Sequence, residues 1–159
     1  MACDPELLSL TRRADSIVLA TVGKVQAREP TGQMIGRRRL YRYRQVLTSR
    51  RRISGRMDGA RVLVTEGLEP SPPVDDPQSA RYPGPYAEGE YILFLRYDAA
   101  HRGYRLVGEW HGVYPVIGGR LIALVGYGVQ ALSGLTVDEA TAAIRACAAG
   151  SRTPGDTGG

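Results

Sequence analysis

The chain has 159 residues, of which 43% are hydrophobic and 23% charged, and its formal net charge is +5. These values are typical of a globular protein with one core, and they exclude a collagen-like or wholly disordered chain. No apolar run reaches the roughly 18 residues of a membrane-spanning helix, so we expect no transmembrane segment. We predict a single domain over residues 1–150 and a disordered tail over 151–159, where small and polar residues dominate.

The first predicted element is a short helix near the N-terminus. Asp4 can cap it, Pro5 suits its first position, and the leucines from Leu7 onward can pack it onto the body. The next segment, residues 16–25, is apolar at odd and even positions alike, which indicates a strand covered on both faces. Residues 26–38 contain one proline and two glycines and are predicted to form a loop.

A second strand is predicted over residues 39–48. Its aromatic and charged residues alternate, so that Tyr41 and Tyr43 share one face while Arg42 and Arg44 share the other. We therefore expect the tyrosines to face the core and the two arginines to face solvent.

The middle of the chain is predicted to be rich in loops. Residues 49–59 form a hairpin connection on this interpretation, and they lead into a strand over 60–66. Residues 67–88 contain six of the ten prolines. Because proline donates no amide hydrogen, we expect neither a helix nor a central strand there. A connection of this length is often functional, and it is our first candidate for a binding surface.

Three further strands are predicted, over residues 88–98, 103–109 and 112–125, and the last of these folds back at Gly118-Gly119. Strands and helices do not alternate along the chain, which argues against a doubly wound sheet. The pattern predicts a mainly β fold: a small antiparallel OB-like barrel of six or seven strands, with a short N-terminal helix and a C-terminal helix.

The C-terminal helix has clear boundary signals. Thr136 and Glu139 match a capping box, and Gly150 ends the helix. Helical spacing turns Cys147 toward the body of the protein. Cys3 and Cys147 are the two cysteines of the chain, and they are either joined in a disulfide, which needs an oxidising compartment, or left as two independent thiols.

Several segments together carry a family resemblance, in the order RRADSIVLATVGKV, YRYRQVL, YAEGEYILFLR, YRLVGEWHGVYPVIGGRL and LTVDEATAAIR. In this order they resemble bacterial extracytoplasmic OB-type β-barrel domains, which are similar to the netrin-like and tissue-inhibitor-of-metalloproteinase fold. The resemblance covers about half of the chain. It implies a binding or inhibitor-like module without catalysis, an extracytoplasmic location, and a protein or cell-envelope partner.

The N-terminus departs from the pattern of the animal inhibitors. Those proteins chelate a protease zinc through a free N-terminal cysteine in a Cys-x-Cys start, whereas here Met1-Ala2 precede Cys3 and Asp4-Pro5 follow it. That role is therefore not carried over to Cys3. The first residues also lack the basic-then-apolar order of a signal peptide, so the protein is either cytoplasmic or has a leader upstream of this sequence.

Tyr86, Trp110 and His111 are the candidate partner-binding residues outside the arginine-rich region. Trp110 and His111 lie between two predicted strands, beside Glu109, where they can form a contact spot or simply pack. A hydrolase built on His111 would need a nucleophile in hydrogen-bond reach, and no nucleophile motif is present. We therefore predict that the protein is not an enzyme.

Other short motifs predict no ligand. The segment GYGVQA at 126–131 matches a dinucleotide fingerprint only superficially, because no helix follows it at once, and we predict a turn. Asp75 and Asp76 lack the further oxygen ligands that calcium needs, so we expect solvated loop acids. We predict no cofactor and no metal.

The arginine-rich stretch supports an alternative function. No acidic residue occurs between Pro30 and Met57, whereas arginines cluster from Arg37 to Arg56. OB-type barrels bind single-stranded nucleic acid with basic grooves and stacked aromatic residues, so this region is the candidate surface for nucleic acid or another polyanion. Its predicted contact residues are Arg42, Arg44, Arg50, Arg51 and Arg52. A positively charged, solvated strand face is the competing interpretation.

Overall fold

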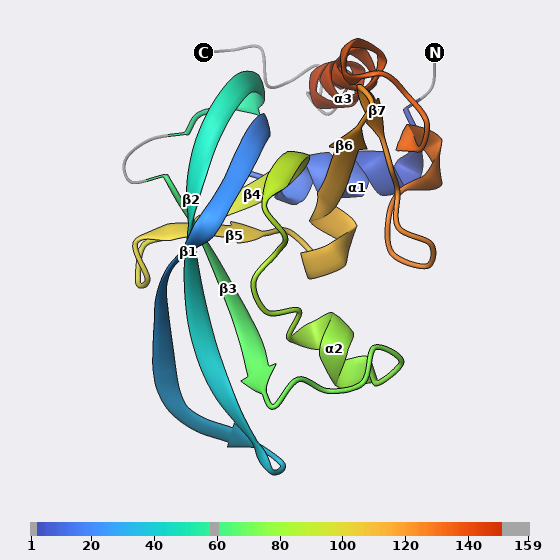
Figure 1. Ribbon diagram of the computed structural model, residues 1–159. Coiled ribbons are helices and arrows are strands. Elements are labelled where there is room, and N and C mark those ends of the chain that lie inside the picture. The colour runs from blue at the N-terminus through green and yellow to red at the C-terminus, as the bar shows by residue number, and fades with distance from the viewer. Residues whose placement is uncertain (1–2, 58–60, 151–159) are drawn as a thin grey trace.

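The computed structural model describes residues 3–57 and 61–150. Within these ranges the elements, shown in Figure 1, are α1 (Pro5–Arg13), β1 (Ser16–Ile35), β2 (Arg38–Gly55), β3 (Val62–Glu69), α2 (Pro77–Arg81), β4 (Gly89–Asp98), β5 (Gly103–Leu106), the 3-10 helix η1 (Glu109–Gly112), β6 (Val113–Ile117), β7 (Arg120–Leu121), the 3-10 helix η2 (Gln130–Leu132) and α3 (Val137–Gly150).

The strands close partly into a ring. β1 pairs with β2 on one edge and with β4 on the other, both antiparallel. β2 continues to β3, and β3 reaches β5 through the parallel register pair Leu63–Tyr104. β5 and β6 occupy two halves of the second edge of β4, and β7 pairs with β6. The prediction of a mainly β, barrel-like fold with terminal helices is confirmed.

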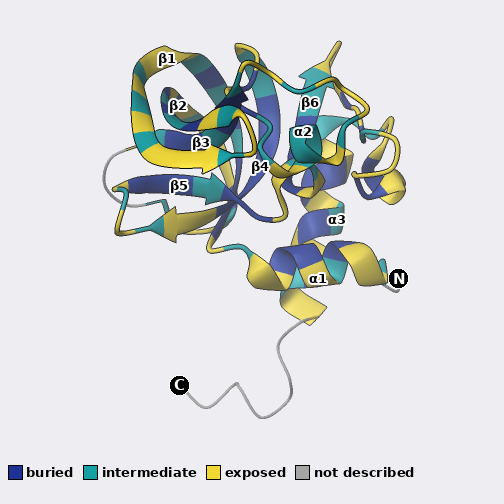
Figure 2. Ribbon diagram, turned by 90° about the horizontal axis from the view of Figure 1, so that it is seen from below, coloured by how far each residue is buried: buried dark blue, intermediate teal, exposed yellow. Residues whose placement is uncertain are grey.

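Two hydrophobic cores lie on the two faces of β1 and β4. Ile17 and Phe94 belong to a core shared with α1 and α3, whereas Val18 and Leu93 belong to a core inside the ring. Successive strand residues point to opposite faces, so each strand serves both cores. The predicted strand with two covered faces is therefore confirmed over residues 16–22, whereas Lys24 and Val25 are exposed. Figure 2 shows buried residues on β4 and on the inner sides of α1 and α3.

The predicted loop over residues 26–38 is wrong. β1 runs to Ile35 and β2 begins at Arg38, so the two strands form a long hairpin arm that reaches beyond the ring in Figure 1. Beyond Val22 the arm has no β4 beside it, and Pro30 lies on an edge strand whose pairing with β2 is interrupted by register shifts. A missing amide is tolerated at such a position, which is why the proline does not end the strand.

The predicted hairpin connection over residues 49–59 is also wrong. β2 continues to Gly55, because residues 49–55 pair with the first part of β1. Residues 58–59 lie outside the described residues. The strand predicted over 60–66 is present as β3, from Val62 to Glu69.

The proline-rich connection contains a short helix that the sequence argument excluded. α2 spans Pro77–Arg81, with proline at its first position and the Asp76 side chain accepting a hydrogen bond from the Gln78 amide at 2.9 Å. Proline is compatible with the first helical turn because the amide there has no intrahelical partner. The connection is otherwise irregular as predicted. The predicted strands after it are present as β4 to β7, but β5 ends at Leu106 and β7 at Leu121, so the predictions were too long at 107–109 and at 122–125. Both residues of the Gly118-Gly119 turn have positive φ.

The terminal helices are tied together covalently. Asp4 caps α1 by accepting hydrogen bonds from the amides of Glu6 and Leu7, as predicted. Cys147 is buried on α3 and forms a disulfide with Cys3, with a Cα–Cα distance of 5.3 Å. The disulfide alternative is the correct one. Residues 151–159, predicted as a disordered tail, lie outside the described residues.

The sequence predicted no transmembrane segment, and the helices of the structure bear on this prediction. In the described part of the chain, none combines the length and the apolar character needed to cross a bilayer.

Candidate binding site

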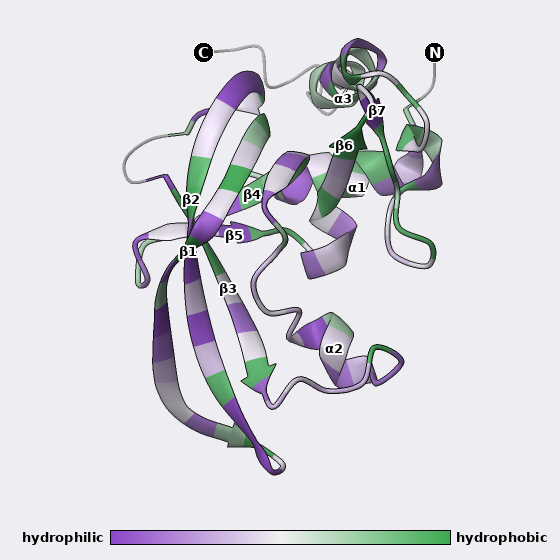
Figure 3. Cartoon of the chain, viewed as in Figure 1, coloured by the Kyte–Doolittle hydropathy of each residue, from purple (hydrophilic) through white to green (hydrophobic). Residues whose placement is uncertain are grey.

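An uncharged groove lies between the proline-rich connection and the segment that follows β7. Its volume is about 730 Å³, and among the described residues that line it none is charged. Tyr43 and Leu68 contribute from the sheet, and Figure 3 shows hydrophobic residues along the segment after β7. We call this groove the aromatic groove, after the side chains on its walls: Tyr43, Tyr82, Trp110 and Tyr127.

The aromatic residues are fixed by contacts behind them. Trp110 is half-buried and packs edge-to-face on Tyr86, with 4.9 Å between the ring centroids. The backbone of Tyr86 is in turn held by the buried Gln45 side chain, which accepts from its amide at 3.0 Å and donates to its carbonyl at 2.7 Å. Trp110 is therefore a positioned wall of the groove, and Tyr86 supports it from the barrel interior.

Tyr43 closes the floor of the groove. Its hydroxyl donates a hydrogen bond of 2.6 Å to Glu69 Oε1. Burial, together with this acidic partner, raises the pKa of the Tyr43 phenol. Gly67 lies beside the ring, and a Cβ at that position would stand 2.9 Å from Tyr43 and 2.6 Å from Gly84. The close approach of these three residues requires glycine at position 67.

Large apolar side chains are exposed at the rim of the aromatic groove. Val74 is 94% exposed and Val125 is 90% exposed, while Tyr127 is 39% exposed. Isolated exposed apolar residues are common on protein surfaces, but an apolar rim around an uncharged groove is a feature of interaction sites.

A second groove begins on the other side of Trp110, and we call it the cationic groove. Its volume is about 570 Å³, and it shares Ala80, Trp110 and Tyr127 with the aromatic groove. Its other walls include Arg13 from the end of α1 and Arg81 from the end of α2.

The backbone of η1 shapes the boundary between the grooves. Gly108 and Glu109 both have positive φ, +67° and +55°, and the second is unusual for a residue with a side chain. His111 is exposed, and its Nδ1 lies 2.9 Å from the Gly108 carbonyl oxygen, so this nitrogen carries the proton and donates. The imidazole also lies edge-to-face with Tyr127, at 5.9 Å between centroids. Trp110 thus lines both grooves and His111 lines the cationic groove, and their role as a contact spot stays a prediction.

Glu109 is the acidic residue in the wall of the cationic groove. Partial desolvation raises the pKa of its carboxyl group, and the nearby Arg105 opposes this shift only in part. Glu109 forms no ion pair within the described residues.

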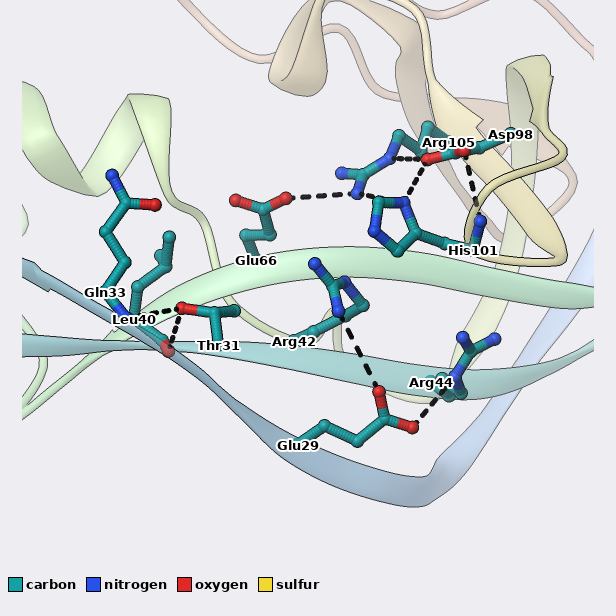
Figure 4. Close-up of polar contacts among 10 residues, drawn as sticks. All are labelled: Glu29, Thr31, Gln33, Leu40, Arg42, Arg44, Glu66, Asp98, His101 and Arg105. Carbon is teal, nitrogen blue, oxygen red and sulfur yellow. Dashed lines mark hydrogen bonds and ion pairs between the residues drawn. The ribbon is translucent and has the colours of Figure 1, made fainter.

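A separate charged cluster lies at the β4–β5 hairpin (Figure 4). Arg105 donates to Asp98 at 2.6 Å and lies 3.0 Å from Glu66, and His101 contacts Asp98 at 2.7 Å. His101 is therefore part of a side-chain network. Partial burial alone would raise the pKa of the Asp98 carboxyl, but the hydrogen bonds from Arg105 and His101 outweigh it and hold that pKa well below its ordinary value.

The predicted arginine surface does not form one unit. Arg42 and Arg44 are only half-buried rather than solvated, and Glu29 lies between them, 4.0 Å from Arg42 and 3.2 Å from Arg44 (Figure 4). Arg51 pairs with Asp138 of α3 at 2.7 Å. Arg50 and Arg52 are exposed at the opposite end of β2. Three of the five predicted arginines thus already have acidic partners, and none of the five lines the aromatic or the cationic groove.

Other predicted features have plain structural roles. The segment 126–131 is a turn followed by a 3-10 helix, as expected, but its Tyr127 lines both grooves. Asp76 caps α2, so it is not simply a solvated acid, whereas Asp75 is exposed. Within the described ranges, no three His, Cys, Asp or Glu side chains gather in a way that could hold a metal ion.

Arg13, Arg81, Val125 and Tyr127 are groove residues that the sequence argument missed. They come from two helix ends and one turn, and no local pattern connects these positions. Tyr127, an aromatic residue between two glycines of the predicted turn, was the one available signal, since turns usually carry polar residues. The chain matches no known family model, and no curated protein is detectably similar to it in sequence.

Proposed function

We propose that this protein is a non-enzymatic binding domain that holds an extended, apolar segment of a partner protein in the aromatic groove. The observation that carries the proposal is the groove itself: uncharged along its described lining, about 730 Å³ in volume, and rimmed by highly exposed valines. Aromatic walls suit an extended peptide because they offer large contact areas at a small entropic cost. The partner's anchor is therefore an aliphatic or aromatic side chain.

Trp110 provides a direct test, because it is the single tryptophan of the chain and lies in the groove wall. Short random peptides displayed on phage are selected on the oxidised full chain, and enriched peptides are titrated while Trp110 fluorescence is recorded. We expect apolar peptides to be enriched and to change the fluorescence. Val125→Asp should weaken their binding about tenfold, since it places a charge at an apolar rim.

Ile117→Asp is the matched control, because Ile117 is 66% exposed but does not line the groove. Binding to this variant should equal binding to the wild type. The proposal is wrong if no peptide is enriched over an unrelated protein, or if Val125→Asp and Ile117→Asp bind equally well.

The strand order supports the finer description of this domain as an OB-type barrel of the netrin-like kind, located outside the cytoplasm. In the ring, β1 closes between β2 and β4, and β3 meets β5 in parallel, which is the arrangement of a five-stranded Greek-key barrel. The Cys3–Cys147 disulfide supports an oxidising compartment. A leader encoded upstream in the gene, together with a two-hydrogen mass loss in protein isolated without reductant, would support this location, and freely alkylated thiols would contradict it.

Binding of a polyanion is the second candidate function, and it now depends on fewer residues. Arg50, Arg52 and Arg56 are exposed, and none of them has an acidic partner within the described residues. This candidate predicts affinity for single-stranded oligonucleotides that falls steeply with salt, and alanine substitution of the three arginines should flatten that slope. Absence of binding at low salt would exclude it.

A further inference from the structure

The aromatic groove and the cationic groove are neighbours, because Ala80, Trp110 and Tyr127 line both. A chain that leaves the uncharged groove across Trp110 therefore enters a groove flanked by two arginines. An extended chain rises about 3.3 Å per residue, so about four residues cover roughly 13 Å and can reach from one groove into the other.

Arg13 and Arg81 are the two arginines that line the cationic groove. Arg13 and Arg81 are both exposed, and neither forms an ion pair with any described carboxylate. Arg105 and Arg44, in contrast, each lie within 3.2 Å of an acidic partner. The Arg81 guanidinium stands 5.8 Å from the centre of the Tyr82 ring, and Arg13 lies against Gly108, at 3.7 Å from the point that a Cβ there would occupy.

The backbone at Gly108 keeps this groove open. With φ at +67°, position 108 favours glycine, and a Cβ there would also stand 3.1 Å from His111. Glu109 is the one acidic side chain among the described residues lining the groove, and its carboxyl has a raised pKa because of desolvation. The lining of the cationic groove therefore combines two guanidinium groups and an exposed imidazole with one carboxyl group, that of Glu109.

We propose that the partner segment carries an acidic side chain within about four residues of its apolar anchor, and that this carboxylate binds between Arg13 and Arg81 while the anchor occupies the aromatic groove. This rests on the proposed function. Charge complementarity supports it, because guanidinium groups bind carboxylates through paired hydrogen bonds. Trp110 and Tyr127 then contact the partner backbone between the two side chains.

The first experiment compares peptide selections on variants of the full chain. Random peptides on phage are selected on the wild type, on Arg13→Ala/Arg81→Ala, and on Arg12→Ala/Arg61→Ala. The last variant loses the same charge at two exposed arginines outside both grooves. We expect Asp or Glu near an apolar residue in peptides from the wild type and from the control, and no acidic preference in peptides from Arg13→Ala/Arg81→Ala.

The second experiment measures the contribution of the carboxylate. An enriched peptide and its copy with Asn or Gln in place of the acidic residue are titrated against each protein by Trp110 fluorescence. The amide copy should bind the wild type about tenfold more weakly, as expected for loss of a charge-assisted pair. On Arg13→Ala/Arg81→Ala the two peptides should bind alike, which is the coupling that a double-mutant cycle detects.

The outcomes separate the two proposals. If no peptide is enriched, the proposed function fails and this inference fails with it. If apolar peptides bind but the acidic and amide copies bind alike to the wild type, only the inference is overturned. A preference for the acidic copy that persists in Arg13→Ala/Arg81→Ala also overturns it, because the carboxylate then binds elsewhere. Unchanged thermal unfolding of the variants shows that the arginines act on binding and not on folding.

Discussion

At the scale of single residues, several charged side chains of this protein are paired with one another. Glu29 forms ion pairs with Arg42 and Arg44, and Asp98 forms an ion pair with Arg105 and a hydrogen bond with His101. Alternation along residues 39–48 correctly placed Tyr43 in the interior, while Tyr41 is half-buried beneath the Arg28 guanidinium at 4.6 Å. Alternation of side chains along a strand predicts which face each residue occupies, but it does not predict which residue of the neighbouring strand lies opposite.

The Asp98 carboxylate is expected to make stability depend on pH. Its pKa is lowered in the folded state, so its stabilising effect is present above the unfolded value of about 3.9 and is lost as the pH falls from there through the folded value. Asp98→Asn should reduce the free energy of unfolding by about 1–2 kcal/mol at neutral pH. The difference from the wild type should shrink below about pH 4, as urea denaturation across a pH series would show.

Asp75→Asn serves as the control, because Asp75 is exposed and forms no ion pair within the described ranges. It should match the wild type at every pH. A gap between Asp98→Asn and the wild type that stays constant into strong acid would contradict the assignment.

At the scale of elements, helix ends were predicted more reliably than strand ends. Asp4 and Thr136 cap their helices as the sequence indicates, because capping uses residues within three positions of one another. The arm formed by β1 and β2 escaped prediction, since a strand containing Pro30 and Gly32 is stable only beside a partner strand. The strand that became β2 was predicted from the sequence, but its pairing with residues 26–35 was not.

The capping box of α3 can be tested by a single substitution. Thr136 Oγ1 accepts from the Glu139 amide at 3.2 Å, and the Thr136 amide donates to Glu139 Oε1 at 3.0 Å. The backbone hydrogen bond from Thr136 lowers the pKa of the Glu139 carboxyl. Thr136→Ala should lower the free energy of unfolding by about 1 kcal/mol in urea denaturation. Thr136→Ser keeps the hydroxyl and should be close to the wild type, so equal losses for both variants would contradict the capping role.

At the scale of the whole molecule, the disulfide joins the two helices that cover one face of the sheet. Cys3 and Cys147 are 144 residues apart, so the bond closes nearly the entire described chain. Both cores depend on β1 and β4, which lie between them. Loss of the bond should therefore affect the global unfolding transition, because α1 and α3 pack on the same strands that form the ring.

Cys3→Ser/Cys147→Ser should be less stable than the oxidised wild type by about 3–5 kcal/mol, since the bond restricts the unfolded chain. Urea denaturation of both proteins, with and without reductant, measures this difference. Reductant should destabilise the wild type to the level of the variant and leave the variant unchanged. Equal stability of the oxidised and reduced wild type would contradict the expected contribution.

Most of the fold was predictable, but little of the candidate site was. The terminal helices, the buried strand over 16–25 and the later strands follow from local periodicity and capping. The position of Trp110 and His111 between strands led to the prediction of a contact spot, and both residues line the cationic groove. Arg13 and Arg81 were not predicted as site residues, because β1, β2 and β3 separate them in sequence and only the folded chain brings both to the cationic groove.

The sequence by itself determined the β-rich class, the two capped helices and the covered faces of β1, since each depends on residues a few positions apart. Tertiary structure alone decided which charges are neutralised and which stay free. Glu29 reaches Arg42 and Arg44 through the register of the arm, whereas Arg13 and Arg81 have no carboxylate partner among the described residues. Register and packing set these distances, and the energy of a charge pair depends on distance and burial rather than on composition.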